Sequence, residues 1–537
     1  MPIRLHNIRA ALDAEAADLS RLAAEKLSIP ADRVAGVRVV RRAIDARHRR
    51  PVFAYTVDVR LGPDEDEEAV AGRAAATRVA EPEEPRLEVS PGKDPLPGRP
   101  VIVGAGPAGL FAAYLLGRYG FRPLVVERGR PAAPRAGDIR CFLGGGPLDP
   151  ESNILFGLGG AGMWSDGKLT CRTTHPLDQF ILHTLVRCGA PERILVDAKP
   201  HVGSDLLHGV VTRLARLVEA EGGEFRYGCR VGALALADGR ASGVRCGGSD
   251  RSDTVAAGAV LLAIGHSARD TVRTLVDQGV AVEGRPFQVG VRIEHPQEMV
   301  DRSQYGKHVG HPRLPAAEYA LRHRARGGWR SVHTFCMCPG GSVVPAVNEA
   351  GGLCTNGMSR SARDGEFANA ALVVPVGPRD FGSGRLDGVA FQERIERAAF
   401  GLSGTFGAPA QRASDFVQDR AGPVPERTSY PLGLVAARYS RLLPRAVYQS
   451  IVHALGMTFD REIRGFAKEQ GTVLGPETRV ASPVRFVRAE RTRESVSTPG
   501  LYPIGEGSGY AGGIMSSALD GLLTARAIIE RFHPGEA

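Results

Sequence analysis

The sequence predicts an α/β protein with a Rossmann-type nucleotide-binding domain, an inserted α+β domain and a small N-terminal α+β domain. Three observations carry this prediction. The chain of 537 residues is longer than one hydrophobic core normally serves. A glycine-rich strand–turn–helix segment begins at Pro100, and a strand, a glycine loop and a long helix follow from Gly500. We expect the small domain over 1–80, a linker over 81–98, the nucleotide-binding domain over 99–285 completed by 492–537, and the inserted domain over 286–491.

Composition narrows the class of protein. Hydrophobic residues make up 43% of the chain and charged residues 24%, and no apolar run approaches the ~20 residues of a membrane helix. The first segment carries charges throughout and lacks the apolar stretch of a signal peptide. The eight cysteines are few for this length, so we expect a reducing cytoplasm. The net charge of +9 comes mainly from arginines spread along the chain, which makes a small-molecule partner a stronger expectation than nucleic acid.

The first part of the chain has the pattern of a small α+β unit. Leucine and alanine recur at helical spacing over 12–29, and apolar residues alternate over 33–45 and 52–61 as in strands. An acidic run at 63–68 and a proline-rich stretch follow, which predicts the linker.

A dinucleotide fingerprint lies at the start of the second part. The G-x-G-x-x-G motif from Gly104 to Gly109 follows an apolar strand and opens a helix, and Glu127 ends the next strand 23 residues after Gly104. The helix N-terminus offers free N–H groups to a pyrophosphate, and the acid suits an unphosphorylated ribose. We expect this segment to bind the cofactor through Gly104, Gly106, Pro107, Ala108, Gly109, Glu127 and Arg128.

Three later segments favour FAD over NAD. They are the glycine loop 154–169, the strand and loop 260–271, and the closing loop and helix start 501–514, of which the last two resemble segments of large flavoproteins. Such a closing segment brings an acidic residue, here Glu506, to the ribityl chain and a helix N-terminus to the flavin. We expect further contacts to a non-covalently bound FAD from Gly159, Gly160, Val231, Ala263, Gly265, Gly505, Glu506, Gly512, Gly513 and Ile514.

Long motifs make the chain similar to a known group. The matching pieces are "RRAIDAR", "VIVGAGPAGLFAA", "PESNILFGLGGAGMWSDGKL", "TFCMCPGGSVVPA", "TNGMSRSARDGEFANAALVV", "ETRVASPVR" and "GLYPIGEGSGYAGGIMSSALDG". Together they resemble uncharacterised bacterial FAD-dependent dehydrogenases of the glutathione-reductase-like class. The resemblance implies FAD, this architecture and a redox activity, but no particular substrate. Leu158 and Met163-Trp164 depart from the group's glycine loop.

What the sequence lacks limits the mechanism. It has no second G-x-G-x-x-G with its strand and helix, and no C-x₄-C pair beside the flavin segments. We therefore predict an oxidoreductase that transfers hydride between a small organic metabolite and a single flavin, with NAD(P)H a possible transient electron donor. The alternatives are a flavoprotein that modifies tRNA or another nucleic acid, and a flavin/thiol redox sensor.

Several side chains in the expected flavin-bordering loops are candidates for catalysis or substrate binding. Lys168 either stabilises reduced flavin or holds an anionic substrate, or it is a surface lysine. His266 either acts as an acid or base in catalysis or forms a hydrogen bond with the backbone. Arg479 and Arg485 suit a bidentate clamp on an anion, or an ion pair with Glu477. Tyr510 stacks near the ring or fills core.

The cysteines of "HTFCMCPGG" leave two interpretations open. Cys336 and Cys338 have only His333 near them, and the ligands that a four-coordinate zinc site requires are missing, so we expect no metal. Either the pair belongs to a half-buried strand, or it takes part in redox chemistry or substrate contact.

Overall fold

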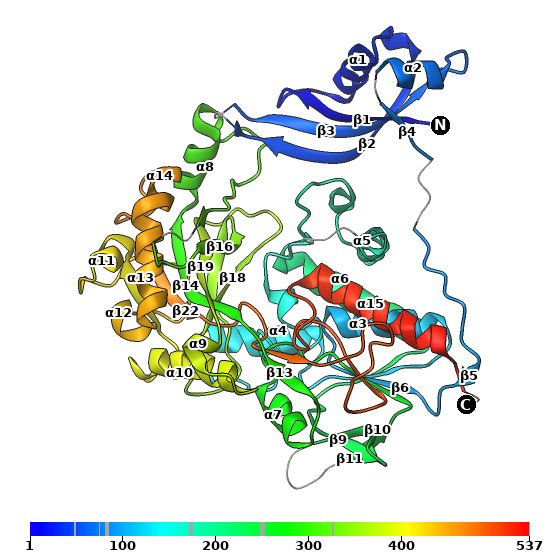
Figure 1. Ribbon diagram of the computed structural model, residues 1–537. Helices are drawn as coiled ribbons and strands as arrows, with labels where there is room; N and C mark the ends of the chain where they lie inside the picture. Colours follow the sequence, from blue (N-terminus) through cyan, green and yellow to red (C-terminus); the bar gives the residue numbers. More distant parts are fainter. Residues whose placement is uncertain are drawn as a thin grey trace.

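The computed structural model describes residues 1–47, 50–74, 76–80, 85–170, 175–247, 253–324 and 327–535. Residues 81–84 of the expected linker therefore lie outside the described residues. Figure 1 shows a small N-terminal sheet beside two larger assemblies, one around a parallel sheet and one around a larger, mainly antiparallel sheet.

The N-terminal unit is a four-stranded sheet in the order β2-β3-β1-β4, with helix α1 packed against β1 and β2. Alternating apolar residues of β1 and β3 form its core together with Ala23 and Leu27 of the helix. Arg42 joins this unit to the rest of the chain, because its side chain pairs with Asp197 at 2.7 Å and its backbone bonds to Val196 and Ala198. The elements are β1 (Ile3–Ala10), α1 (Ala16–Leu27), β2 (Val34–Asp45), β3 (Val52–Leu61), α2 (Glu67–Arg73) and β4 (Thr77–Arg78).

The second unit is built on a five-stranded parallel sheet in the order β24-β12-β6-β7-β8. Four of its strands, β6, β7, β12 and β24, are buried throughout, which is the pattern of a parallel sheet covered on both faces, whereas the edge strand β8 is mostly exposed. Helices α3 and α15 pack against each other on one face, although they are far apart in the sequence (Figure 1). The strands are β6 (Pro100–Val103), β7 (Leu124–Val126), β8 (Glu224–Arg226), β12 (Ala259–Leu262) and β24 (Leu501–Pro503).

The other elements of this unit surround the sheet. Residues 224–226 form the edge strand β8 of the parallel sheet, and the turn at Asp238-Gly239 joins β9 to β10. The elements are β5 (Asp94–Pro95), α3 (Pro107–Arg118), α4 (Ala132–Leu143), α5 (Leu177–Arg187), α6 (Ser204–Ala220), β9 (Val231–Ala237), β10 (Arg240–Cys246), β11 (Asp253–Ala256), α7 (Arg269–Asp277), α15 (Ile514–Arg531) and β25 (Phe532–His533).

The third unit is a seven-stranded sheet in the order β15-β16-β19-β14-β22-β20-β21. In β14, Val289, Val291 and Ile293 face the apolar core shared with α13, while Arg292 and Glu294 alternate with them. Its strands are β14 (Phe287–Pro296), β15 (Arg322–His323), β16 (Val332–Cys338), β19 (Phe367–Val376), β20 (Ala408–Arg412), β21 (Leu434–Ala436) and β22 (Thr472–Glu477). The elements around it are β13 (Val282–Gly284), α8 (Gln297–Tyr305), β17 (Gly341–Pro345), β18 (Thr355–Ser359), α9 (Pro378–Phe381), α10 (Asp387–Gly401), α11 (Ala413–Val417), α12 (Tyr439–Leu442), α13 (Arg445–Ala454), α14 (Asp460–Glu462) and β23 (Val484–Phe486).

Among the described helices, none is both long enough and apolar enough to cross a membrane.

Candidate active site

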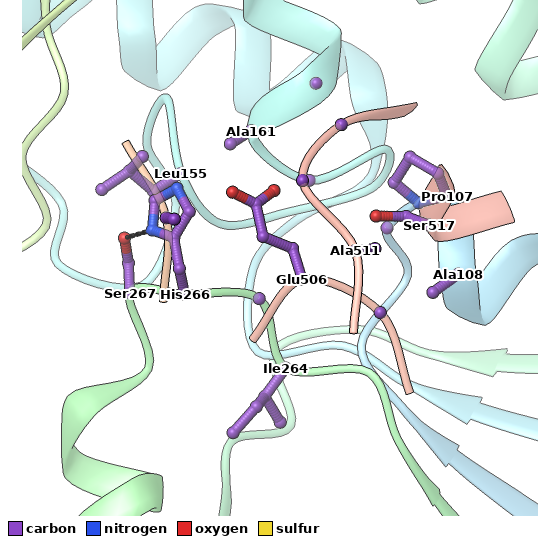
Figure 2. A pocket seen from close by; sticks show the side chains of 18 of the residues that line it. Pro107, Ala108, Leu155, Ala161, Ile264, His266, Ser267, Glu506, Ala511 and Ser517 are labelled. Carbon is purple, nitrogen blue, oxygen red and sulfur yellow. Dashed lines mark hydrogen bonds between the residues drawn. The ribbon is translucent and has the colours of Figure 1, made fainter. Parts of the chain in front are cut away.

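One large cavity of about 1210 Å³ lies where the parallel sheet meets the third unit. The carboxyl ends of β6, β12 and β24 open into it, together with residues of β16 and the end of β22. Ligands of open α/β sheets bind outside the carboxyl ends of the strands, so the position is that of a cofactor site. Figure 2 shows part of its wall.

The turn between β6 and α3 forms a phosphate cradle. Gly104 has φ of +109°, and a Cβ there would lie 2.3 Å from the carbonyl oxygen of Ala263 on the neighbouring strand. Gly106 is the N-cap of α3, and a Cβ there would meet nothing within 4 Å. The backbone therefore leaves open space in front of the helix N-terminus, which suits the pyrophosphate of a dinucleotide.

The carboxylate of Glu127 is buried at the end of β7 and organises the backbone around it. It accepts hydrogen bonds from the N–H groups of Ala105 at 2.8 Å, Gly129 at 2.9 Å and Gly157 at 3.0 Å. These bonds join the first glycine turn to the glycine loop. Glu127 thus lines the cavity beside the place that a ribose would take.

Arg128 closes this end of the cavity. Its guanidinium lies 4.1 Å from the ring centroid of Phe156 and pairs with Glu151 at 2.6 Å and Asp270 at 3.0 Å. Burial lowers the pKa of Arg128, but the carboxylates of Glu151 and Asp270 raise it by more, so the net shift is upward. The stacked, paired guanidinium is a rigid wall for the cofactor's outer end.

Arg135 holds the glycine loop and was missed by the sequence analysis. It lies on α4, is fully buried, and burial lowers its pKa to about 9. The buried face of this helix is otherwise apolar and consists of Ala132, Ala136, Ile139 and Phe142. An arginine at the same helical spacing could have indicated a buried cation. Its guanidinium donates to the carbonyl oxygens of Asn153, Ile154, Gly157, Leu158 and Gly160.

Glu506 projects its carboxylate into the cavity (Figure 2). No described residue hydrogen-bonds to this side chain. Burial raises the pKa of Glu506 to about 7, and the neighbouring Cys336 acts in the same direction. The N-terminal residues of α15 line the cavity nearby: Gly512, Gly513 and Ile514. A carboxyl and a helix N-terminus thus face the same space.

The cysteine pair divides between the cavity and the core. Cys336 lies on the cavity wall, whereas Cys338 is 0% exposed behind it. A β-bulge interrupts the pairing of β16 between Phe335 and Cys338, and Cys336 has φ of +45°. The bulge breaks the alternation of the strand, so the two cysteines have different surroundings.

Polar groups surround the peptide of this bulge. The ammonium of Lys168 donates to the carbonyl oxygen of Met337 and pairs with Asp166 at 2.8 Å. The carbonyl oxygen of Cys336 accepts a hydrogen bond from Arg292 at 3.3 Å, and another from the Cys338 thiol at 3.3 Å. Lys168 is therefore a cavity residue bound to its neighbours and not a surface lysine.

The two thiols differ in acidity. The neighbouring Cys338 thiol lowers the pKa of Cys336 to about 6; burial opposes this, and the cations Lys168 and Arg292 add to it. The Cys336 side chain and burial raise the pKa of Cys338 well above its ordinary value. Of the two thiols, the one on the cavity wall is therefore the more acidic.

His266 is on the cavity wall but is held neutral. Burial lowers its pKa to about 4, and the cations Arg479 and Arg269 add to this effect. Its Nδ1 lies 2.8 Å from the hydroxyl of Ser267 (Figure 2). A neutral imidazole donates a hydrogen bond through one ring nitrogen and accepts one through the other, but with this pKa it is a weak base.

Arg479 is engaged in a buried ion cluster. It pairs with Glu396 at 2.8 Å, and Arg269 pairs with the same carboxylate at 2.8 Å. Glu477, the partner considered from the sequence, pairs instead with Arg292 at 2.6 Å. Arg479 lines the cavity, but its charge is already neutralised.

Arg485 and Tyr510 lie together near the surface end of the cavity. The Arg485 guanidinium is 5.3 Å from the Tyr510 ring centroid and 3.6 Å from Glu283. The Tyr510 hydroxyl donates to the carbonyl oxygen of Phe486 at 2.9 Å.

The structure brings most of the sequence-predicted residues to this one cavity. Three do not line it: Gly109 packs against the backbone of Gly104, Gly159 packs against Val211 and Met163, and Cys338 is in the core. No group of three or more His, Cys, Asp or Glu side chains suited to a metal ion occurs among the residues that the structure describes. The sequence-predicted residues that do line the cavity include Ala108, Arg128, Gly160, Val231, Gly265 and Gly505.

Comparison with known proteins agrees with this geometry. Residues 286–480 match the family model "FAD-dependent protein, C-terminal domain-like", residues 102–165 match an NAD(P)-binding Rossmann-like domain, and residues 2–76 match a domain of unknown function. An uncharacterised protein of Clostridium beijerinckii is 39% identical over 541 residues, with 99% of both chains covered.

Solved structures show only distant similarity. A geranylgeranyl bacteriochlorophyll reductase-like protein from Thermoplasma acidophilum is 12% identical, covering 80% of this chain and 77% of that one, with a TM-score of 0.34. Glycine oxidase from Bacillus cereus is 11% identical, covering 80% and 97%, with a TM-score of 0.33. Scores this low add nothing to the assignment of the site.

The residues present fit FAD. The open turn at Gly106 would hold the pyrophosphate, Glu127 would face the adenosine ribose, Glu506 the ribityl chain, and the N-terminus of α15 the flavin. The chain therefore belongs to the family of FAD-dependent proteins that carries this C-terminal domain, and it is an FAD-dependent oxidoreductase.

Proposed function

We propose that the protein oxidises or reduces a small organic metabolite by hydride transfer to or from its single flavin. The observation that carries this proposal is the cavity itself: one space of about 1210 Å³ extends from the phosphate cradle to the polar wall at Cys336. Bound FAD supplies the hydride chemistry. The sequence has one dinucleotide fingerprint, so any NAD(P)H would have to enter this same cavity as a transient donor. The low cysteine content supports a cytoplasmic enzyme.

The residues on the polar wall have distinct proposed roles. The Cys336 thiolate accepts a proton from the substrate or returns one, because its pKa of about 6 lies close to physiological pH. Lys168 fixes the bulge and keeps positive charge beside the thiolate. His266, neutral at pH 7, orients a substrate group by a hydrogen bond.

The test is anaerobic reduction of the bound flavin. Purified protein should be yellow, and one of NADH, NADPH or a panel of metabolites should bleach it. Gly106→Trp fills the open space in front of α3 and should give a folded, colourless protein, whereas Gly137→Ala, on the exposed side of α4, should remain yellow. Wild-type protein that neither purifies with FAD nor takes it up would contradict the proposal.

A thiol-based redox sensor is the second candidate, favoured by the position of Cys336 on the cavity wall with Cys338 next to it. In that case Cys336→Ser and Cys338→Ser would leave FAD bound and change thiol reactivity when the flavin is reduced. A flavin that every metabolite leaves oxidised, together with such a change, would favour the sensor over the enzyme.

A further inference from the structure

Two arginines converge at the surface end of the cavity. Arg485 lies in β23, and Arg285 follows β13, its antiparallel partner, in which Glu283 is paired with Arg485. Both side chains adjoin Gly509 of the closing loop: Arg285 donates to its carbonyl oxygen, and a Cβ on this glycine would lie 3.0 Å from the Cβ of Arg485. Both line the cavity beside Tyr510.

These arginines lack the carboxylates that neutralise others around the cavity. Arg292 and Arg479 pair with buried glutamates at 2.6 Å and 2.8 Å. Among the described residues, Arg285 has no carboxylate within ion-pair distance. Arg485 has Glu283 alone, at 3.6 Å, and that side chain is 54% exposed.

Two further observations indicate unsatisfied charge at this place. The Nε of Arg485 is buried and has no hydrogen-bond partner in the described structure. Burial lowers the pKa of Arg285, and the nearby charge of Arg485 lowers it further. Of these two close guanidinium groups only Arg485 has a carboxylate within ion-pair distance, so this end of the cavity carries a net positive charge. An anion that receives hydrogen bonds from both would relieve it.

Apolar residues line the same cavity as the arginines. Pro286 follows Arg285 directly, and Pro375, Phe335 and Val480 also lie on the wall, together with the polar Gln288. A matching ligand therefore combines an anionic group with an apolar body.

We propose that Arg285 and Arg485 form an anion subsite that binds the carboxylate or phosphate of an amphipathic metabolite at the mouth of the flavin cavity. The identification of this metabolite as the redox substrate rests on the proposed function. The planar guanidinium forks suit the two oxygens of a carboxylate and the oxygens of a phosphate equally well. Experiment must decide between these two classes.

The test measures ligand binding to the oxidised, FAD-loaded protein. Acetate, hexanoate, inorganic phosphate, hexyl phosphate and NADP⁺ are titrated separately at fixed ionic strength, and the flavin absorbance difference and the melting temperature are recorded. We expect a saturable response to hexanoate or hexyl phosphate that exceeds the response to the matching bare anion. Arg285→Gln and Arg485→Gln should each weaken binding by about tenfold or more, the factor for one lost charge-assisted hydrogen bond.

Three further variants keep the result interpretable. Arg485→Lys retains the charge and should bind more weakly than wild type but better than Arg485→Gln. Glu283→Gln removes the competing carboxylate from an exposed position and should tighten binding. Arg526→Gln changes an arginine on α15 that pairs with Glu530 outside the cavity, and it should bind as wild type does.

The possible results identify the ligand class or contradict the subsite. Preference for hexyl phosphate or NADP⁺ assigns the subsite to a phosphate, and preference for hexanoate assigns it to a carboxylate. A response that is absent, or unchanged in both Arg→Gln variants while their FAD content is normal, overturns the proposal. Because no turnover is needed, a protein that binds these anions but is reduced by no metabolite would contradict the proposed function and leave the subsite intact.

Discussion

Cys336, on the wall of the flavin cavity, has a positive φ, a backbone conformation that residues other than glycine seldom adopt. The cost of such a conformation is of order 1–3 kcal/mol and must be offset by the surroundings. Here Lys168, Arg292 and the Cys338 thiol bond to the carbonyl groups of the bulge. The strain thus places one thiol in the cavity and its neighbour in the core.

The acidity of Cys336 can be measured by alkylation. In protein freed of FAD, iodoacetamide should label Cys336 with a rate that rises with pH to a midpoint near pH 6, as its pKa of about 6 requires. Lys168→Met removes a nearby cation and should move this midpoint upward. Peptide mass spectrometry assigns the label, and the exposed Cys141 is the internal reference. Equal labelling of Cys338, or no slowing after FAD is added, would contradict the placement.

Glu506 gives a second prediction, from its raised pKa. The carboxyl titrates near 4.5 in the unfolded chain and near 7 in the folded protein without FAD. Its contribution to stability is therefore fully present below pH 4.5 and is lost as the pH rises through about 7. Glu506→Gln should remove this loss, so the melting-temperature difference between variant and wild type should grow in favour of the variant between pH 4.5 and 7. A difference that stays constant over this range would be evidence against the raised pKa.

Single residues also show what the sequence could and could not predict. Gly106, Glu127 and Glu506 could be found because each occupies a fixed place in a local motif, and all three line the cavity. The partner of Arg479 could not be found, since Glu396 lies 83 residues away and only the fold brings them together. The bulge at Cys336 is equally hidden, because one extra residue in a strand leaves no mark on its composition.

At the scale of elements, one wall of the cofactor cavity depends on the glycine loop, which contributes Leu155, Phe156 and Gly160 to the lining. The glycine loop between α4 and the 3₁₀ turn at Ala161–Trp164 has no strand or helix to fix it. Arg135 supplies the missing support by donating to five of its carbonyl groups. The buried guanidinium thus supplies hydrogen-bond donors to the loop carbonyl groups, as a neighbouring strand does in a sheet. The sequence predicted the loop itself but not its support.

Removal of this support should affect cofactor and fold together. Arg135→Met retains much of the side-chain volume but leaves the loop carbonyls without a donor, each at a cost of about 1–3 kcal/mol where no water replaces it. We expect a fall in FAD affinity and a lower melting temperature, measured by flavin release and by calorimetry. Arg140→Met, on the exposed face of the same helix, is the matched control and should change neither. An Arg135→Met protein that holds FAD as tightly as wild type would show that the loop needs no such anchor.

On the scale of the whole molecule, a buried ion cluster joins the parallel-sheet unit to the third unit. Arg269 begins α7, Glu396 lies in α10, and Arg479 follows β22. Burial raises the pKa of Glu396, but the two arginines overcome this and hold it well below the ordinary value of 4.5. The cluster lies beside the cavity, so the relative position of the two units and the shape of the site are fixed by the same contacts.

Glu396→Gln should therefore destabilise the protein strongly at neutral pH. It leaves two buried guanidinium groups with only the half-exposed Glu349 as a counter-charge, a loss of about 3–5 kcal/mol. In the wild type the same stabilisation is present above the unfolded carboxyl's pKa near 4.5 and is lost as the pH falls below it, so the variant and the wild type should converge in acid. Denaturant unfolding at several pH values measures this. Glu349→Gln, which removes a 46% exposed carboxylate 3.4 Å from Arg269, should cost less than about 1 kcal/mol.

The order of strands in the parallel sheet has a consequence for biosynthesis. β6 ends at Val103, but β24, which completes the sheet, begins at Leu501, and α15, the packing partner of α3, comes later still. At about 5–20 residues per second, roughly 20–80 s of translation separate the two segments. All strands of the N-terminal sheet and of the seven-stranded sheet are synthesised before β24 and α15. The face of α3 that packs against α15 therefore stays uncovered until α15 has been synthesised. The polypeptide can therefore complete its cofactor site only after β24 and α15 have been synthesised.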